Sequence, residues 1–88
     1  MKTESIADTI SEARQRNIQF LVIDSELALT FLDLAKTTWS AEKSRRLIGE
    51  AQKACETILS FVYRLRLTPD NAPILHRNLK ILVSRLGG

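Results

Sequence analysis

The chain has few of the residues that build loops, turns and disulfide bonds. Its 88 residues include three Gly, two Pro and one Cys, and aromatic residues make up only 6%. So little Gly and Pro argues against a loop-rich or β-rich fold, and a single Cys excludes an internal disulfide and a cysteine-based zinc site. We therefore expect a helical protein, and the sparing use of cysteine favours a cytoplasmic location.

Long apolar segments are also missing. The first ten residues hold no continuous apolar stretch of the kind a signal peptide needs, and the most apolar run, residues 20–23, is far shorter than the ~20 residues of a membrane span. With 44% apolar and 26% charged residues, the composition is that of a folded globular protein. We expect one soluble helical domain over residues 1–88, because two separate cores would need a longer chain.

The clearest pattern in the chain lies in residues 41–66, which are predicted to form a helix. Its apolar residues recur at steps of three and four, which places them on one stripe of a helix; they are Leu47, Ala51, Ala54, Ile58, Phe61 and Leu65. A second apolar line beside this stripe consists of Ile48, Cys55, Leu59 and Val62. Ser40 is the expected N-cap, and a turn over residues 68–71 ends the helix. Two apolar lines predict the central helix of a bundle.

Residues 3–38 are predicted to form the first helix, which has one polar and one apolar stripe. The polar stripe is Asp8, Glu12, Arg16, Gln19, Glu26, Thr30, Asp33 and Thr37, with Ile23 as its one apolar member. The opposite stripe is apolar except for Asn17 and Asp24; it consists of Ile6, Ile10, Ala13, Asn17, Phe20, Asp24, Leu27, Phe31 and Leu34. The polar stripe keeps its phase through residue 24, which favours one long helix. The alternative is that Asp24 caps a second helix.

The third predicted helix covers residues 72–86. Pro73 fits its first turn, where a missing N–H costs nothing, and two glycines follow its end. Its apolar seam is Leu75, Leu79, Leu82 and Leu86. Because both connections are short, the prediction is an all-α, three-helix, up-down-up bundle with a long first helix.

The segment RLTPDNAPILHRNLKILVSRLGG, residues 66–88, resembles the end of one tetratricopeptide repeat and the first helix of the next. That family joins its helix pairs through a proline-containing turn, as at Pro69, and has a large apolar residue eight positions earlier, as at Phe61. The resemblance implies TPR-like helix packing and a helical array that binds proteins.

The tip of the hairpin formed by the first two helices is the predicted partner-binding surface. A third helix of ~15 residues, at 1.5 Å per residue, is too short to cover it. The candidate binding residues are Phe31, Leu34, Ala35, Trp39, Leu47 and Ala51. An amphipathic helix of a partner or a second protomer would fit such a groove. The alternative is that Trp39 folds over the tip and closes it.

Self-association is predicted at the start of the first helix. In a tight hairpin the end of the second helix reaches the level of residue 14, so that residues 1–13 extend beyond it. The apolar residues of this extension are Ile6, Ile10 and Ala13. Burying an isoleucine is worth ~1.5–3 kcal/mol, which favours a homo-oligomer and most simply a dimer.

The C-terminal half of the chain is basic, and this supports an alternative function. Residues 41–88 carry nine Lys or Arg and four Asp or Glu. Candidate phosphate contacts are Arg64, Arg66, Arg77, Lys80 and Arg85. They would suit a nucleic-acid-binding helical protein, although the interleaving of acids and bases favours a solvated helical face.

Residues that could carry catalysis are sparse. Cys55 lies on the apolar flank of its helix, where a thiol behaves as a small hydrophobe, and His76 has no second metal ligand at a suitable spacing. We expect no metal and no cofactor.

A second alternative rests on a resemblance to the all-helical chorismate mutase, which also folds as three helices of about this length. The nearest matches to its cationic site are Arg14 or Arg16 in the first helix, and Arg45 or Arg46 with Glu50 in the second. That family has a lysine midway along its first helix and a glutamine late in its third, and this chain has neither. We therefore expect a non-catalytic protein.

Overall fold

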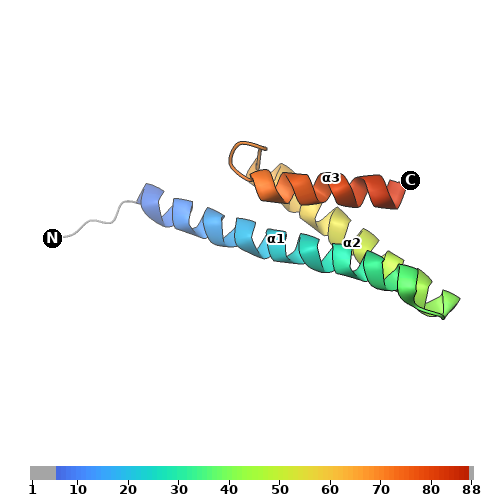
Figure 1. Cartoon of the computed structure of the whole chain (residues 1–88). Helices are drawn as coiled ribbons and strands as arrows, with labels where there is room; N and C mark the ends of the chain where they lie inside the picture. Colours follow the sequence, from blue (N-terminus) through green and yellow to red (C-terminus); the bar gives the residue numbers. More distant parts are fainter. Residues whose placement is uncertain (1–5, 88) are drawn as a thin grey trace.

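The computed structural model describes residues 6–87, with side chains from residue 13 onward, and within them it contains three helices and no strand. Helix α1 is Ile6–Thr37, α2 is Ala41–Leu65 and α3 is Pro73–Gly87 (Figure 1). Helices α1 and α2 form an antiparallel hairpin, and α3 packs on one side of it. The predicted all-α, up-down-up fold with a long first helix is confirmed.

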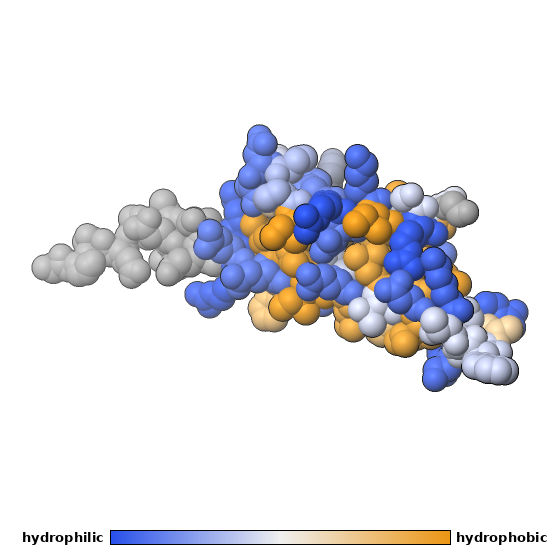
Figure 2. Space-filling view, in the orientation of Figure 1, coloured by the Kyte–Doolittle hydropathy of each residue, from blue (hydrophilic) through white to orange (hydrophobic). Residues whose placement is uncertain are grey.

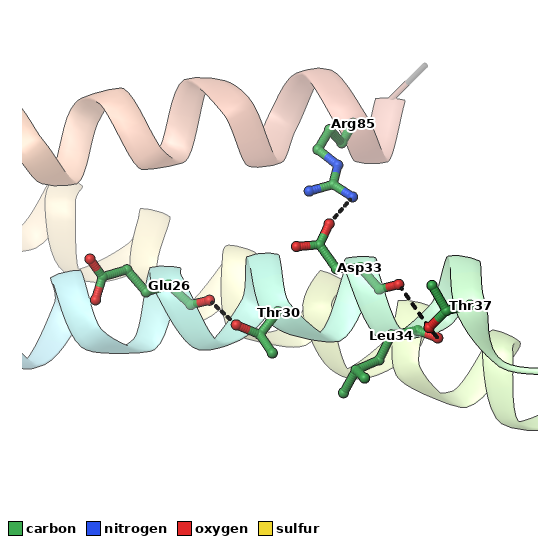
Figure 3. Close-up of polar contacts among 6 residues, drawn as sticks. All are labelled: Glu26, Thr30, Asp33, Leu34, Thr37 and Arg85. Carbon is green, nitrogen blue, oxygen red and sulfur yellow. Dashed lines mark hydrogen bonds and ion pairs between the residues drawn. The ribbon is translucent and has the colours of Figure 1, made fainter.

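Helix α1 is continuous through Asp24, as the unbroken polar stripe favours. From residue 16 onward, that stripe is exposed to solvent. Two of its threonines donate their hydroxyls to main-chain carbonyls one turn earlier: Thr30 Oγ1 lies 3.0 Å from the Glu26 oxygen, and Thr37 Oγ1 lies 3.2 Å from the Leu34 oxygen (Figure 3). These bonds satisfy the hydroxyls within the helix.

The ends of α2 follow from its sequence. Ser40 is the N-cap, and its side-chain oxygen accepts a hydrogen bond of 3.1 Å from the Lys43 N–H. At the other end Arg66 adopts a left-handed conformation with φ 54°, and the next N–H, of Leu67, donates to the Val62 oxygen at 2.9 Å. This pattern closes a helix by satisfying its last carbonyls. The helix therefore ends at residue 65, one residue before the predicted boundary.

The α2–α3 connection is held by reciprocal hydrogen bonds. The Thr68 N–H donates to Asn71 Oδ1 at 2.7 Å, and the Asn71 N–H donates to Thr68 Oγ1 at 3.2 Å. His76 links α3 to the connection by a further hydrogen bond, because its Nε2–H donates to the Leu67 carbonyl at 2.9 Å. Pro73 is the first residue of α3, as predicted. The connection is thus specified by side chains that cap both its ends.

One hydrophobic core joins the three helices. Its buried residues are Leu21, Ala28 and Leu32 from α1, Ala51, Cys55 and Ile58 from α2, Leu67 and Ala72 from the connection, and Leu75, Leu79 and Leu82 from α3. The predicted seams of α2 and α3 supply most of these residues. Small side chains in α1 and α2 let those helices approach closely, and α3 fills the remaining space with leucines.

The apolar stripe that the spacing marks on α1 is not the one that packs against α3. Phe20, Leu27 and Leu34 are exposed, whereas Leu21, Ala28 and Ala35 are buried one position further along the chain. A shift of one residue turns the helix by 100°. Helix α1 has two apolar stripes, and α3 packs against the one with the smaller side chains.

A polar pair is buried between α1 and α3. Asn78 Nδ2 donates to Ser25 Oγ at 2.9 Å, and Ser25 Oγ donates to the Val22 carbonyl at 2.6 Å. Both side chains are buried. Since a buried polar group is costly without a partner, the pair fixes the register of α3 on α1. The sequence analysis did not identify it; a polar residue inside each apolar seam was the available signal.

Beyond the two ends of α3, α1 continues alone at the N-terminal side, and the tip of the α1–α2 hairpin continues at the other (Figure 1). At the N-terminal side, residues 13–17 are all exposed, and among the described side chains of α1 Ile18 is the first that packs against the core. The overhang therefore reaches further than the predicted limit of residue 13. Within residues 6–87, no helix is both long and apolar enough to span a membrane.

Candidate protein-interaction surface

The face of the α1–α2 hairpin that α3 leaves uncovered carries two apolar stripes. On α1 the stripe contains Phe20, Leu27 and Leu34, and on α2 it contains Leu47, Ala54 and Phe61. Each step is seven residues, or two helical turns, so the members of a stripe lie on one face. We call these six residues, together with Phe31, the open face.

The orientation of the open face is visible in Figure 3. The Leu34 side chain points away from α3, whereas the neighbouring Asp33 points toward Arg85 of α3. In Figure 2 apolar side chains gather along the edge of the molecule below α1, on the side turned away from α3. They also fill the furrow between α1 and α3. The open face and α3 thus occupy different sides of the hairpin.

The open face is strongly apolar and largely solvated. The side chains of Phe20, Leu27, Leu34 and Phe61 are 65%, 49%, 49% and 37% exposed. Between the two stripes lies a groove of about 230 Å³, whose lining includes Leu27, Phe31 and Ala54 with Asp24, Glu50 and Lys53 at its polar margin. A contiguous apolar surface rimmed by charged residues is typical of protein interfaces.

The predicted partner-binding residues are divided between this face and the core. Phe31, Leu34 and Leu47 belong to the open face, and Trp39 is fully exposed in the tip connection. The assignments of Ala35 and Ala51 to a binding surface are wrong, because α1 and α2 bury both small side chains where they pack together. The alternative that Trp39 folds over the tip is also wrong, since its side chain contacts no core.

A second groove lies near the tip, on the side of α3. It encloses about 470 Å³ and is lined by Leu32, Ala35, Lys36, Ser44, Ile48, Ser84 and Arg85. A hydrogen bond at the base of this groove joins the two helices of the hairpin: Ser44 Oγ of α2 donates to the Ala35 carbonyl of α1 at 2.9 Å. The last turn of α3 therefore reaches this groove, and the uncovered part of the tip is shorter than predicted.

Of the predicted self-association residues, only Ala13 has a described side chain. It is exposed on the overhang of α1. The side chains of Ile6 and Ile10 lie outside the described residues. Ala13 and Asn17 continue the three-and-four spacing of the open face toward the N-terminus, since Phe20 is the next member.

The five candidate phosphate contacts do not form one cluster. Arg85 pairs with Asp33 of α1 at 2.9 Å (Figure 3). Arg64 donates to Ser60 Oγ at 3.2 Å, and its guanidinium lies 5.1 Å from the centre of the Phe61 ring. Arg66 follows at the C-cap of α2, while Arg77 and Lys80 line a groove between α2 and α3. The basic side chains are spread over the bundle and do not converge on one ligand.

Cys55, which the sequence offers as a candidate nucleophile, is part of the hydrophobic core. Cys55 is buried, and burial together with the charge of Glu56 raises the pKa of its thiol, which keeps it neutral and unreactive. Among residues 13–87, no three His, Cys, Asp or Glu side chains are grouped as metal ligands would be. The arginines matched to the chorismate mutase site lie at opposite ends of the hairpin: Arg14 on the α1 overhang and Arg45 next to the tip.

Comparisons with known proteins do not extend these observations. No family model matches the chain. No curated protein and no solved structure matches it either. The open face and the physical chemistry of its residues are therefore the features that indicate a function.

Proposed function

We propose that this protein is a non-catalytic interaction and assembly module that binds other protein chains through the open face of its α1–α2 hairpin. The observation that carries the proposal is the exposure of Phe20, Leu27, Leu34 and Phe61 on one side of the molecule. Leaving several large apolar side chains in water is unfavourable by about 25 cal/mol per Å². Contact with another apolar surface removes that cost, so this face has the energetic means to bind.

The geometry of the face indicates what kind of surface it takes. Two parallel ridges of side chains with a groove between them accept the side chains of another helix, as in helical bundles. The tetratricopeptide resemblance of residues 66–88 implies the same class of function. In contrast, the basic residues are spread out and partly paired with other side chains, so nothing specific in the structure favours a nucleic-acid ligand.

The test uses the full chain as bait in cells that express it, followed by chemical cross-linking and mass spectrometry of the captured proteins. The variant Leu27→Lys puts a charge at the centre of the open face. The matched control is Leu59→Lys, since Leu59 is also exposed but lies in the groove between α2 and α3. We expect Leu27→Lys to lose captured proteins, including further copies of the chain, that Leu59→Lys retains. Identical sets for all three baits would contradict the proposal.

A further inference from the structure

We infer that the occupant of the open face is a second copy of this chain, and that two hairpins form a four-helix bundle with both tips at the same end. The inference rests on the proposed function, since it uses the same surface. Three features of the described residues support it: the levels at which the open-face side chains lie, the charges of the two helices, and the size of the face.

The open-face residues lie in pairs at matching levels. Leu27 and Ala54 line the same groove and so lie at about the same level, and the pairs Leu34–Leu47 and Phe20–Phe61 lie seven residues to either side of them. The hydrogen bond from Ser44 to Ala35 fixes this register at the tip.

A two-fold axis parallel to the helices would place α1 of one copy against α2 of the other at the same level. Each pair of one copy then packs against the same pair of the other copy, and the two pairs form a layer of four side chains. The layer nearest the tip would contain four leucines, the middle layer two leucines and two alanines, and the far layer four phenylalanines. Layers of this kind form the cores of four-helix bundles.

The charges of the helices select this orientation over its alternative. Helix α1, residues 6–37, carries five acidic and three basic residues, whereas α2, residues 41–65, carries three acidic and five basic residues. With tips together, each helix of the bundle adjoins only helices of the opposite net charge. With tips at opposite ends, α1 would lie on α1 and α2 on α2. Like charges repel across an interface, so complementarity favours the first arrangement.

One polar residue interrupts the apolar stripe of α1. Asp24 lines the same groove as Lys53 of α2, which carries the opposite charge. A single polar position within an apolar seam is a known means of fixing register and the number of helices in a bundle. Asp24 would therefore disfavour alternative alignments of the two hairpins.

The face is large enough for a stable dimer. The paired part of the hairpin covers about 17 residues per helix, or about 26 Å at 1.5 Å per residue, and two adjacent helices are about 20 Å wide. Two such faces in contact bury on the order of 1,000 Å², which is the lower bound for a specific interface.

Sedimentation equilibrium on the purified full chain tests the inference. We expect a dimer at micromolar concentration. Leu27→Lys should raise the dissociation constant at least about a hundredfold, because the charge enters the interface twice. Leu59→Lys should leave the constant unchanged. If Leu27→Lys proves unfolded by circular dichroism, Leu34→Lys offers a second exposed position on the same face.

A wild-type chain that stays monomeric up to several hundred micromolar would overturn the inference. The proposed function would survive that result if the cross-linking experiment still lost proteins with Leu27→Lys, since the occupant would then be a different protein. Equal dissociation constants for the wild type and both open-face variants would also overturn the inference, because the dimer would then use another surface.

The relative orientation of the two hairpins in the dimer can be measured separately, from the distance between two spin labels. A spin label is attached to Lys43→Cys, an exposed position in the first turn of α2, in a Cys55→Ala background. With tips together, the two labels lie at the same level, and we expect a separation below about 30 Å. With tips opposed, the levels differ by about 33 Å along the bundle, so the separation is at least about 33 Å. The longer distance would overturn the tips-together arrangement.

Discussion

The two sides of the α1–α2 hairpin differ in the size of the side chains they present. The side that packs against α3, which we call the closed side, carries small residues from α1 and α2. Among them are Ser25, Ala28 and Ala51, all of which are completely buried. The open face carries Phe20, Leu27 and Leu34, which are larger and about half exposed or more.

This difference shows that the size of the apolar side chains in a stripe does not determine whether the stripe is buried. Where two long helices and a third one share a core, close approach requires small side chains, and α3 supplies the volume with its leucines. Large side chains would hold the helices apart at that position. They remain on the opposite side, where a further helical surface has the room to pack against them.

The largest expected effect is the difference in the free energy of unfolding between variants in the core and a variant on the open face. Ile58→Ala and Leu75→Ala should each lower the free energy of unfolding by ~2–5 kcal/mol, because both side chains are fully buried and their loss leaves a cavity. Leu27→Ala should cost only about 1 kcal/mol, since half of that side chain is already in water.

Urea denaturation, followed by circular dichroism at a concentration low enough to keep the chain monomeric, measures both effects. Overlapping midpoints for the two sets would mean that the open face contributes to the core as much as the closed side does. The comparison between the two sides would then fail.

The next effect concerns the polar pair on the closed side. Asn78→Ala should lower the free energy of unfolding by ~1–3 kcal/mol, because it removes the hydrogen bond to Ser25 Oγ and leaves space in the core. Ser25→Ala should cost a similar amount, since it leaves the Asn78 amide buried without that acceptor. The double variant Ser25→Ala/Asn78→Ala should be more stable than the sum of the single effects predicts, because neither polar partner is then left buried without the other.

A double-mutant cycle on urea midpoints measures the coupling between these two positions. Strictly additive effects would show that the pair does not act as a unit and that the register of α3 is set by the leucines alone.

Cys55 reports on the closed side through its protonation. Burial, together with the charge of Glu56, raises the pKa of the thiol above its usual value of 9.0. The folded protein therefore binds this proton more tightly than the unfolded chain does. The resulting stability is complete below the unfolded pKa and falls as the pH rises through the higher native pKa.

We expect alkylation of Cys55 by iodoacetamide to be at least about tenfold slower in the native protein than in urea at the same pH. The control is a Cys55→Ala/Gln52→Cys variant, because Gln52 is exposed on the same helix and does not line the groove of the open face. Equal rates at the two positions would show that the closed side opens readily.

The smallest effect is that of the surface pair between α3 and α1. Arg85 and Asp33 lie 2.9 Å apart, but their side chains are 26% and 70% exposed. Solvent screens such a pair, so Arg85→Ala or Asp33→Asn should lower the free energy of unfolding by ~0–1 kcal/mol, and less at high salt. Thermal unfolding at low and high ionic strength measures it. A larger, salt-independent loss would mean that the end of α3 is anchored mainly by this pair.

The local features of the fold could be predicted from the sequence because they depend on neighbouring residues. Ser40 accepts its hydrogen bond three residues away, Pro73 starts α3 because its ring fits only the first turn, and the step of three and four along α2 places Ile58 in the core. The continuity of α1 through Asp24 followed likewise from the phase of its polar stripe. These relations act within one or two helical turns, and the residue order determines them.

Only the tertiary structure decided which apolar stripe of α1 faces inward. Both stripes have helical spacing, and the one with Phe20 and Leu27 is the more hydrophobic, so periodicity alone selects the wrong one. The choice depends on the distance at which α1 and α2 pack and on the leucines that α3 brings from 40 to 60 residues away. The burial of Ala35 and Ala51, which sequence analysis had placed on a binding surface, has the same cause. Close packing of helices depends on the shapes of side chains that are distant in the sequence, and a pattern within one helix does not contain that information.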